Sequence, residues 1–315
     1  MCEFTSRINQ FESIFRHPRI VFIIMKVTEL ITYLLLNVLS LIFSTLSRNL
    51  SLLLGKTIGM GLYFIPIRKK VARKNIEIAF KNKTALQREY ILLKCYQHYG
   101  IVLSDFLSQK KINKNNLDDY FVFEKNMKQK LRNANGGCIL SAHIGNWEMV
   151  LPAMGLNNIQ MDTVVMRQSN KTANDFYIKL RQFKNINLIY KDGALRKLYQ
   201  AINEGRMIGL ASDQNARARG LKIDFFNKRS SFPKGAGKFY YKTSSKLFIV
   251  FCILRSDFKY YVYTKELKIN LTGKSEDEVI ESVVKSYAHI LTDKIKQHPE
   301  QYFWFHKKWG KSVYN

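Results

Sequence analysis

The segment with the clearest capacity for chemistry is SAHIGNWE, residues 141–148. A neutral imidazole with a pKa of about 6.5 can accept the proton of an alcohol, and a carboxylate at its other ring nitrogen fixes the tautomer and stabilises the imidazolium. His143 and Glu148 supply these two groups, so the sequence predicts a general base, His143, that is oriented by Glu148. No serine or cysteine nucleophile is required if the substrate brings its own hydroxyl group.

A corner between a strand and a helix would bring these two side chains together. The apolar run at residues 138–140 predicts a strand that ends just before His143, and Asn146 is a favourable N-cap for the helix that follows. Ligands of open parallel sheets bind at the carboxyl ends of the strands. Five positions apart, His143 and Glu148 would lie on different faces of one continuous helix, but Gly145 permits a tight corner at which they meet.

The remainder of the chain predicts the elements around this corner. After residue 107, short apolar runs alternate with helical ones, which is typical of an α/β fold with a mixed, largely parallel central sheet flanked by helices. Two β-like runs, KLFIVFCIL and YYVYTKELKI, precede a final helix from about Ser275 to Gln297. A long helix is expected from Thr84 to about Leu107, because Gln87 completes a capping box with Thr84.

The N-terminal part predicts a membrane anchor. An apolar stretch extends from Ile20 to Leu46, and residues 31–46 carry no charge, although about 20 apolar residues are needed to span a bilayer. Lys26 and Glu29 interrupt the upstream half, which leaves a spanning helix and an interfacial helix both open. A buried core helix is a further alternative. The simplest division is an anchoring region at residues 1–47 and a catalytic domain at residues 48–315.

Charge and the absence of familiar motifs narrow the function. Subtracting the 24 acidic side chains from the 51 basic ones leaves a net charge of +27, which indicates an anionic partner, although a biased genome can also raise the lysine content. The four cysteines form no CxxC pair and have no nearby histidine at metal-ligand spacing, so no metal site is expected. The chain contains no HExxH or GxSxG motif, and its GKT lacks the first glycine of a phosphate loop because Leu50 stands there.

Five ordered blocks resemble the lipid A late acyltransferases, a family within the lysophospholipid acyltransferase superfamily. HIGNWE is similar to their His-x4-acid motif. The other similar blocks, in chain order, are VARKNIEIAF at 71–80, VVMR at 164–167 with Asn170 and later Arg181, ASDQNA at 211–216 followed by IDFF and a Pro-x-Gly helix start at Pro233, and HPEQYFWFHKKW at 298–309.

This resemblance implies transfer of a fatty acyl chain from an acyl carrier protein thioester to a hydroxyl of a lipid A precursor, a step of lipopolysaccharide biosynthesis. His143 would deprotonate the acceptor hydroxyl and Glu148 would orient His143. No metal or dissociable cofactor is implied beyond the acyl donor. The enzyme would be attached to the bacterial inner membrane with its catalytic domain on the cytoplasmic side. The expected substrate-binding residues are Asn146, Arg167, Asp213 and Gln214.

Two other functions are compatible with parts of the sequence. An enzyme of the same fold could acylate a lysophospholipid, glycolipid or aminolipid, but glycerol-phosphate-type relatives usually carry Asp where this chain has Glu148. A basic nucleic-acid-binding protein would explain the charge alone, and it should carry basic residues interleaved with exposed aromatic residues. The anchor-like segment argues against this second class, so no nucleic-acid partner is expected.

Overall fold

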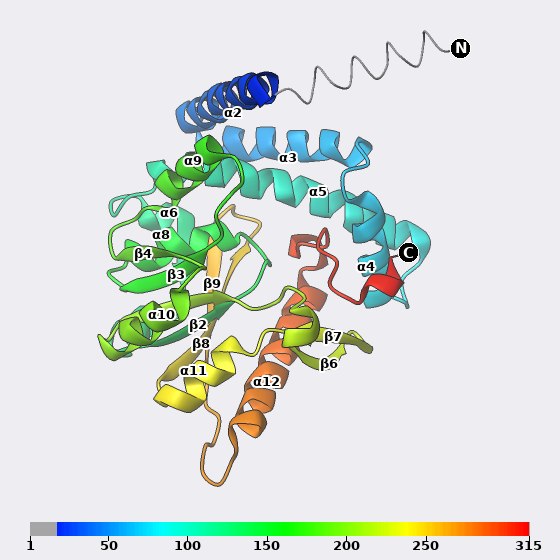
Figure 1. Ribbon diagram of the computed structural model, residues 1–315. Helices are drawn as coiled ribbons and strands as arrows, with labels where there is room; N and C mark the ends of the chain where they lie inside the picture. The colour runs from blue at the N-terminus through cyan, green and yellow to red at the C-terminus, as the bar shows by residue number, and fades with distance from the viewer. Residues whose placement is uncertain (1–17, 315) are drawn as a thin grey trace.

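A seven-stranded mixed sheet forms the centre of the molecule (Figure 1). The computed structural model describes residues 18–314, so residues 1–17 of the predicted anchoring region and Asn315 lie outside the described part of the chain. The strands of the sheet are, in chain order, β1 (Phe121–Phe123), β2 (Gly137–Ser141), β3 (Met161–Val165), β4 (Ile186–Tyr190), β5 (Met207–Ala211), β8 (Lys246–Leu254) and β9 (Tyr260–Leu267).

The spatial order of the strands is β1-β9-β8-β2-β5-β3-β4. Strands β8, β2, β5, β3 and β4 pair in parallel, β9 pairs antiparallel with β8, and β1 is parallel to β9. The predicted α/β fold with a mixed, largely parallel sheet is therefore confirmed. A separate hairpin of β6 (Leu221–Phe225) and β7 (Lys228–Phe232) was not predicted.

Helices cover both faces of the sheet (Figure 1). Side chains of β2 alternate between two hydrophobic cores: Cys138 and Leu140 pack on one face, and Ile139 packs on the other. Burial on both faces explains why β2 reads as a continuous apolar run instead of an alternating one. The helices of the first face are α4 (Lys69–Ala79), α5 (Ala85–Ser108), α10 (Ala194–Asn203), α11 (Gly235–Thr243) and α12 (Glu276–Gln297). Those of the second are α6 (Leu117–Tyr120), α7 (Met127–Arg132) and α8 (Val150–Gly155).

Two long helices begin at capping boxes, of which the sequence predicted the one at Thr84. Thr84 accepts a hydrogen bond from the Gln87 main chain and Gln87 reciprocates, which fixes the start of α5. Ser275 and Glu278 form the same arrangement at the start of α12. Both helices then pack their apolar sides against the first face of the sheet and support it on that side.

The N-terminal helix α2 (Pro18–Thr45) is long and apolar enough to cross a membrane. Only 6% of its most apolar stretch is buried, so the alternative of a buried core helix does not hold. Phe43 on its inner side packs with Phe106 of α5 and Leu180 of α9 (Lys171–Arg181). Its exposed apolar side chains include Leu30, Ile31, Leu34, Leu35, Val38 and Leu41.

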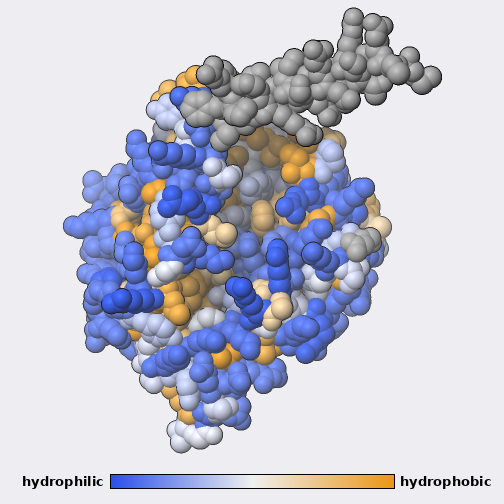
Figure 2. Space-filling view, in the orientation of Figure 1, coloured by the Kyte–Doolittle hydropathy of each residue, from blue (hydrophilic) through white to orange (hydrophobic). Residues whose placement is uncertain are grey.

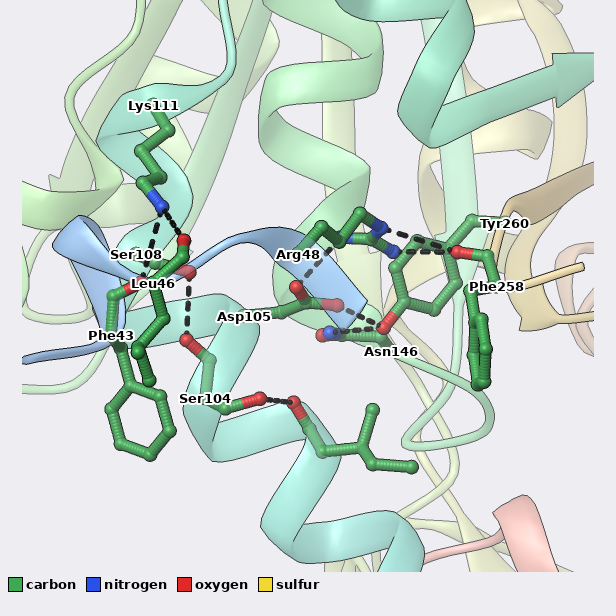
Figure 3. A network of polar contacts seen from close by, with 11 residues as sticks. Phe43, Leu46, Arg48, Ser104, Asp105, Ser108, Lys111, Asn146, Phe258 and Tyr260 are labelled. Atoms are coloured by element: carbon green, nitrogen blue, oxygen red, sulfur yellow. Dashed lines mark hydrogen bonds and ion pairs between the residues drawn. The ribbon is translucent and has the colours of Figure 1, made fainter. Parts of the chain in front are cut away.

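A polar network connects the junction between α2 and α3 (Arg48–Phe64) to the turn that follows His143 (Figure 3). Arg48 pairs with Asp105 at 2.7 Å and donates to the main-chain carbonyl of Phe258. The Tyr260 hydroxyl donates to Asp105 at 2.5 Å and accepts from the Asn146 amide at 3.0 Å. The start of α3, the end of α5, β9 and the segment after His143 are thus held in one chain of contacts.

Replacing Arg48 with methionine is expected to lower the free energy of unfolding by about 3 kcal/mol, because it leaves the Asp105 carboxylate buried and unpaired. Urea unfolding of the detergent-solubilised protein would measure the loss. The double variant Arg48→Met with Asp105→Asn is expected to recover part of it, since the uncompensated charge is gone. A single variant as stable as the parent protein would contradict this role for the pair.

Candidate active site

The register of two neighbouring strands places the site. In the parallel pair β2–β5, Ser141 lies opposite Ala211, and the main-chain N–H of Ser212 donates to the Ser141 carbonyl at 3.0 Å. His143 and Asp213 each follow this last paired position by two residues. They therefore leave the same edge of the sheet side by side, at the carboxyl ends of parallel strands where ligands of such sheets bind.

His143 and Asp213 form the central pair. The Nδ1 atom of His143 lies 2.8 Å from Oδ1 of Asp213, and Nε2 lies 3.5 Å from the side-chain nitrogen of Gln214. The Asp213 side chain is 3% exposed, whereas that of His143 is 20% exposed. The carboxylate is thus buried behind the imidazole, and the imidazole remains accessible from the cavity. The rings of Trp147 and Phe303 lie 5.1 and 6.1 Å from the imidazole and limit its rotation.

The electrostatics of this pair favour a basic imidazole. Burial by itself lowers the pKa of His143, but the charge and hydrogen bond of Asp213, together with the more remote charge of Glu148, outweigh burial and raise that pKa above its ordinary value. Burial opposes ionisation of Asp213, yet His143 and the Lys308 ammonium lower its pKa below the usual range. The ionised carboxylate of Asp213 therefore lies against Nδ1 of His143, and it makes Nε2 a stronger base.

Glu148 occupies a different position from the one that the sequence predicted. Arg181, at the end of α9, holds its carboxylate with two hydrogen bonds of 2.8 and 2.7 Å, and the Trp147 indole donates to it at 3.2 Å. Asp213, instead of Glu148, is therefore the hydrogen-bond partner of His143. The short helix Trp147–Met149 that follows the corner points the Glu148 side chain towards α9, where the guanidinium satisfies it.

Two further residues that were expected to bind substrate do not line the cavity beside His143. Asn146 precedes the short helix as its N-cap, but its side chain makes no capping hydrogen bond; it is fully buried and donates to Tyr260. It does not line the cavity beside His143. Arg167 is exposed, and its guanidinium lies over the ring of Tyr190 at 4.4 Å, while its neighbours Met166 and Gln168 line the cavity.

A cavity of about 500 Å³ opens beside His143. Its polar wall contains His143, Glu148, Arg181 and Gln214, and its other walls come mainly from apolar residues of β2, α8, β3 and β5. Figure 2 shows a hollow between α9 and the C-terminal segment, with hydrophobic residues inside a largely hydrophilic surface. The volume lies within the usual range for a ligand site. The apolar lining residues are Ile139, Val150, Leu151, Met161, Val164, Val165, Met166 and Leu210.

A larger groove of about 1120 Å³ lies elsewhere, between the α4–α5 turn, the β6–β7 hairpin and α12. Most of its charged residues pair locally, as in Lys285 with Glu281 at 2.6 Å and His289 with Asp293 at 3.4 Å. It contains neither His143 nor Asp213. The smaller cavity is the better candidate, because it combines a positioned base with apolar walls that suit a hydrocarbon chain.

Sequence reasoning underestimated two contributions to this site. Asp213 was expected only as a substrate-binding residue, and its contact with His143 depends on β2 and β5 being neighbours. Arg181 was noted only through the family resemblance, and its distance along the chain from Glu148 gave no sign of their pairing. The C-terminal segment also reaches the site, because the main-chain N–H of Phe303 donates to the His143 carbonyl at 2.9 Å.

The chain is similar in sequence to known acyltransferases. The chain is 23% identical to the lipid A biosynthesis palmitoleoyltransferase of Escherichia coli (strain K12) over 266 residues, 81% of this chain and 83% of that protein. It is 25% identical to the phosphatidylinositol mannoside acyltransferase of Mycolicibacterium smegmatis over 129 residues, 39% of this chain and 42% of that protein. The crystal structure of the 1-acyl-sn-glycerophosphate acyltransferase PlsC from Thermotoga maritima matches with a TM-score of 0.37 and 14% identity, covering 79% of this chain and 98% of that chain. The model of the bacterial lipid A biosynthesis acyltransferases matches residues 10–311, nearly the whole chain. The chain is therefore an acyltransferase that belongs to the bacterial lipid A biosynthesis acyltransferase family.

Proposed function

We propose that this enzyme transfers a fatty acyl chain from an acyl carrier protein thioester to a hydroxyl of a lipid A precursor, with His143 as general base and Asp213 as its orienting carboxylate. The observation that supports this most directly is the 2.8 Å contact between His143 Nδ1 and Asp213, which leaves Nε2 at the cavity. Membership of the family implies an acyl donor and a lipid acceptor. The identities of both substrates are part of the proposal.

In the proposed reaction, His143 Nε2 takes the proton of the acceptor hydroxyl as the oxygen attacks the thioester carbonyl carbon. A carbon–oxygen bond forms, the carbon–sulfur bond breaks, and the imidazolium returns its proton to the departing thiolate. Asp213 keeps the Nδ1–H tautomer and stabilises the imidazolium while it exists. The substrate supplies the nucleophile, so no covalent enzyme intermediate is needed.

The other residues of the polar wall have separate roles in the proposal. Glu148 holds Arg181 through Nε and Nη2, and in the proposal Nη1 donates to an anionic group of the substrate. Gln214, within 3.5 Å of His143 Nε2, lies where a reacting hydroxyl would approach. Arg167 lies outside the cavity on an exposed segment that precedes α9, where it is available to phosphate groups that extend beyond the mouth.

Charge and the N-terminal helix support the proposed partners and location. A net charge of +27 suits an acidic carrier protein, a phosphorylated saccharide lipid and an anionic membrane surface. The exposed apolar helix α2 suggests a membrane anchor. We place the catalytic part, residues 48–315, on the cytoplasmic side of the inner membrane, where acyl carrier protein thioesters are made, with residues 1–47 as the anchoring region.

The proposal is tested with purified enzyme and defined substrates. Acyl carrier protein thioester and a lipid A precursor should give an ester product that mass spectrometry identifies by the added acyl mass. Parallel reactions contain a lysophospholipid or a phosphatidylinositol mannoside, since one relative is named for the latter acceptor. Efficient acylation of either alternative, with none of the lipid A precursor, would replace the proposed acceptor and leave the acyltransferase chemistry in place.

The pH dependence of kcat/KM should report the state of His143. Only the neutral imidazole accepts a proton, so the rate is expected to fall as pH falls through the pKa of His143. Because that pKa is raised, the midpoint of the acidic limb should lie above about 6.5. Initial rates at subsaturating acceptor across this range measure it. A midpoint well below that value would contradict the predicted effect of Asp213.

A further inference from the structure

We propose that Lys308 is a positioning residue for the His143–Asp213 pair and that it acts through the hydrogen bond it donates to the Asp213 main-chain carbonyl. The inference rests on the proposed function, because it concerns how the same site is held together. Lys308 belongs to the C-terminal segment, residues 298–309, which leaves α12 and runs towards α4 (Figure 1). This segment contacts both loops that carry the pair.

The first half of the C-terminal segment holds the His143 loop. The main-chain N–H of Phe303 donates to the His143 carbonyl at 2.9 Å, and the main-chain N–H of Gly145 donates to the Gln301 carbonyl at 2.9 Å. These bonds form a short antiparallel contact that continues the pairing of the loop beyond β2. The main chain from the His143 carbonyl to Gly145 is therefore tied to the segment.

The second half holds the Asp213 loop. Lys308 Nζ donates to the Asp213 main-chain carbonyl at 2.5 Å, and the Asn215 side-chain amide donates to the Trp309 carbonyl at 3.0 Å. One stretch of chain thus fixes His143 at one end and Asp213 at the other. The distance between the imidazole and the carboxylate depends on both attachments, and a shift of about 1 Å in a catalytic group can cost about a hundredfold in rate.

Lys308 is an unusual residue for a purely structural role. It is 2% exposed, and a buried ammonium loses several kcal/mol of hydration that a packed apolar side chain would not. Its Nζ lies 3.3 Å from the centre of the Phe232 ring, and its carbonyl accepts from Ser230 Oγ at 3.1 Å. Burial lowers the pKa of Lys308 to about 7, although the negative charge of Asp213 acts to raise it.

The ionisable groups near Lys308 come from two elements. Asp213 faces it from the loop after β5, and His306 faces it from the C-terminal segment itself. The β6–β7 hairpin presents the rings of Phe225 and Phe232 to the ammonium. Removing the ammonium therefore changes the charge around Asp213, and any test must separate this effect from the loss of the hydrogen bond.

Two variants of equal side-chain length make this separation. Lys308→Met removes both the donor and the charge, whereas Lys308→Gln removes the charge and keeps a donor. We expect kcat of Lys308→Met to fall about tenfold, with KM for the acyl donor little changed, because the His143–Asp213 contact loosens. The acidic limb of its pH profile should lie at lower pH than that of Lys308→Gln, since Asp213 no longer raises the His143 pKa fully. Lys308→Gln should retain most of the parent kcat.

Lys307→Met is the matched control, because Lys307 is the adjacent lysine and is exposed. It should leave both kcat and the pH profile unchanged. A general loss of folded enzyme would scale the rate equally at every pH and would not move the midpoint. Parent-like kcat and pH profile in folded Lys308→Met, or equal impairment of the Met and Gln variants, would overturn the proposal.

Two further measurements cover the remaining cases. If Lys308→Met does not fold, Ser230→Ala removes the hydrogen bond to the Lys308 carbonyl, and the proposal then requires a smaller loss of kcat with the same direction of pH shift. Nitrogen-15 NMR titration of His143, assigned with a His143→Asn sample, reports the imidazole pKa without any substrate. Unchanged titration of His143 in Lys308→Met, or in Ser230→Ala if Lys308→Met does not fold, would overturn the role of Lys308. Absence of acyl transfer by the parent enzyme would overturn only the proposed function.

Discussion

Replacing His143 with alanine is expected to lower the rate of acyl transfer by about a thousandfold, because the acceptor hydroxyl loses its proton acceptor. The side chain lies beyond the end of β2 at the cavity, so its removal should leave the sheet intact. Product formation from a carrier protein thioester and lipid acceptor measures the loss. Thermal unfolding and membrane association should match those of the parent enzyme.

His289→Ala provides the control for this variant. His289 also pairs with a carboxylate, Asp293, but it is 78% exposed on α12 and lies outside the cavity. It should retain full activity. A folded His143→Ala enzyme with activity comparable to His289→Ala would remove His143 from the reaction.

The second large effect is expected for Asp213→Asn. The amide preserves the size of the side chain but removes the charge that stabilises the imidazolium, and it no longer fixes the Nδ1–H tautomer, so kcat should fall by about a thousandfold. The acidic limb of the pH profile should move to lower pH, because Asp213 is the main group that raises the His143 pKa. Rate profiles against pH test both effects in one experiment.

Glu148→Gln distinguishes the two carboxylates. The variant keeps a polar partner for Arg181, and Glu148 acts on His143 only through space, so its acidic limb should move less than that of Asp213→Asn. Activity should still fall, because the pair with Arg181 forms part of the cavity wall. A larger shift for Glu148→Gln would make Glu148 the orienting carboxylate, as the sequence alone predicts.

Asp162→Asn controls for the loss of any buried carboxylate. Asp162 is 1% exposed and pairs with Arg206 at 2.8 Å, away from the cavity. Its neutralisation should reduce stability without moving the acidic limb. A shift of the limb in this variant would mean that the pH profile reports general damage instead of the state of His143.

The sequence predicted the location of the base because that inference is local. An apolar run, a histidine and a glycine corner lie within a few residues of one another, and the parallel sheet then sets the edge on which they appear. The choice of carboxylate is not local, since Asp213 lies 70 residues from His143. It depends on β5 lying beside β2, and an alternating α/β pattern does not specify which strands are neighbours.

Tertiary contacts also overrode two residue preferences. Asn146 favours an N-cap, yet the Tyr260 hydroxyl of β9 offers it a buried partner that no sequence spacing reveals. The Tyr190 ring at the end of β4 likewise holds the Arg167 guanidinium outside the cavity, so the phosphate contact that we propose for Arg167 lies beyond the mouth. In both cases a residue from another strand decides the orientation of the side chain.

The packing of α2 has a kinetic consequence. Phe43 of α2 and Leu180 of α9 share one hydrophobic cluster, and the next residue, Arg181, reaches the cavity wall. With α2 in the bilayer, a lipid can meet this guanidinium while its hydrocarbon tails remain among neighbouring phospholipids. Turnover would then depend on the mole fraction of acceptor in the membrane. Diluting the acceptor with inert lipid, while the total amount of acceptor in the reaction stays constant, should therefore slow the enzyme.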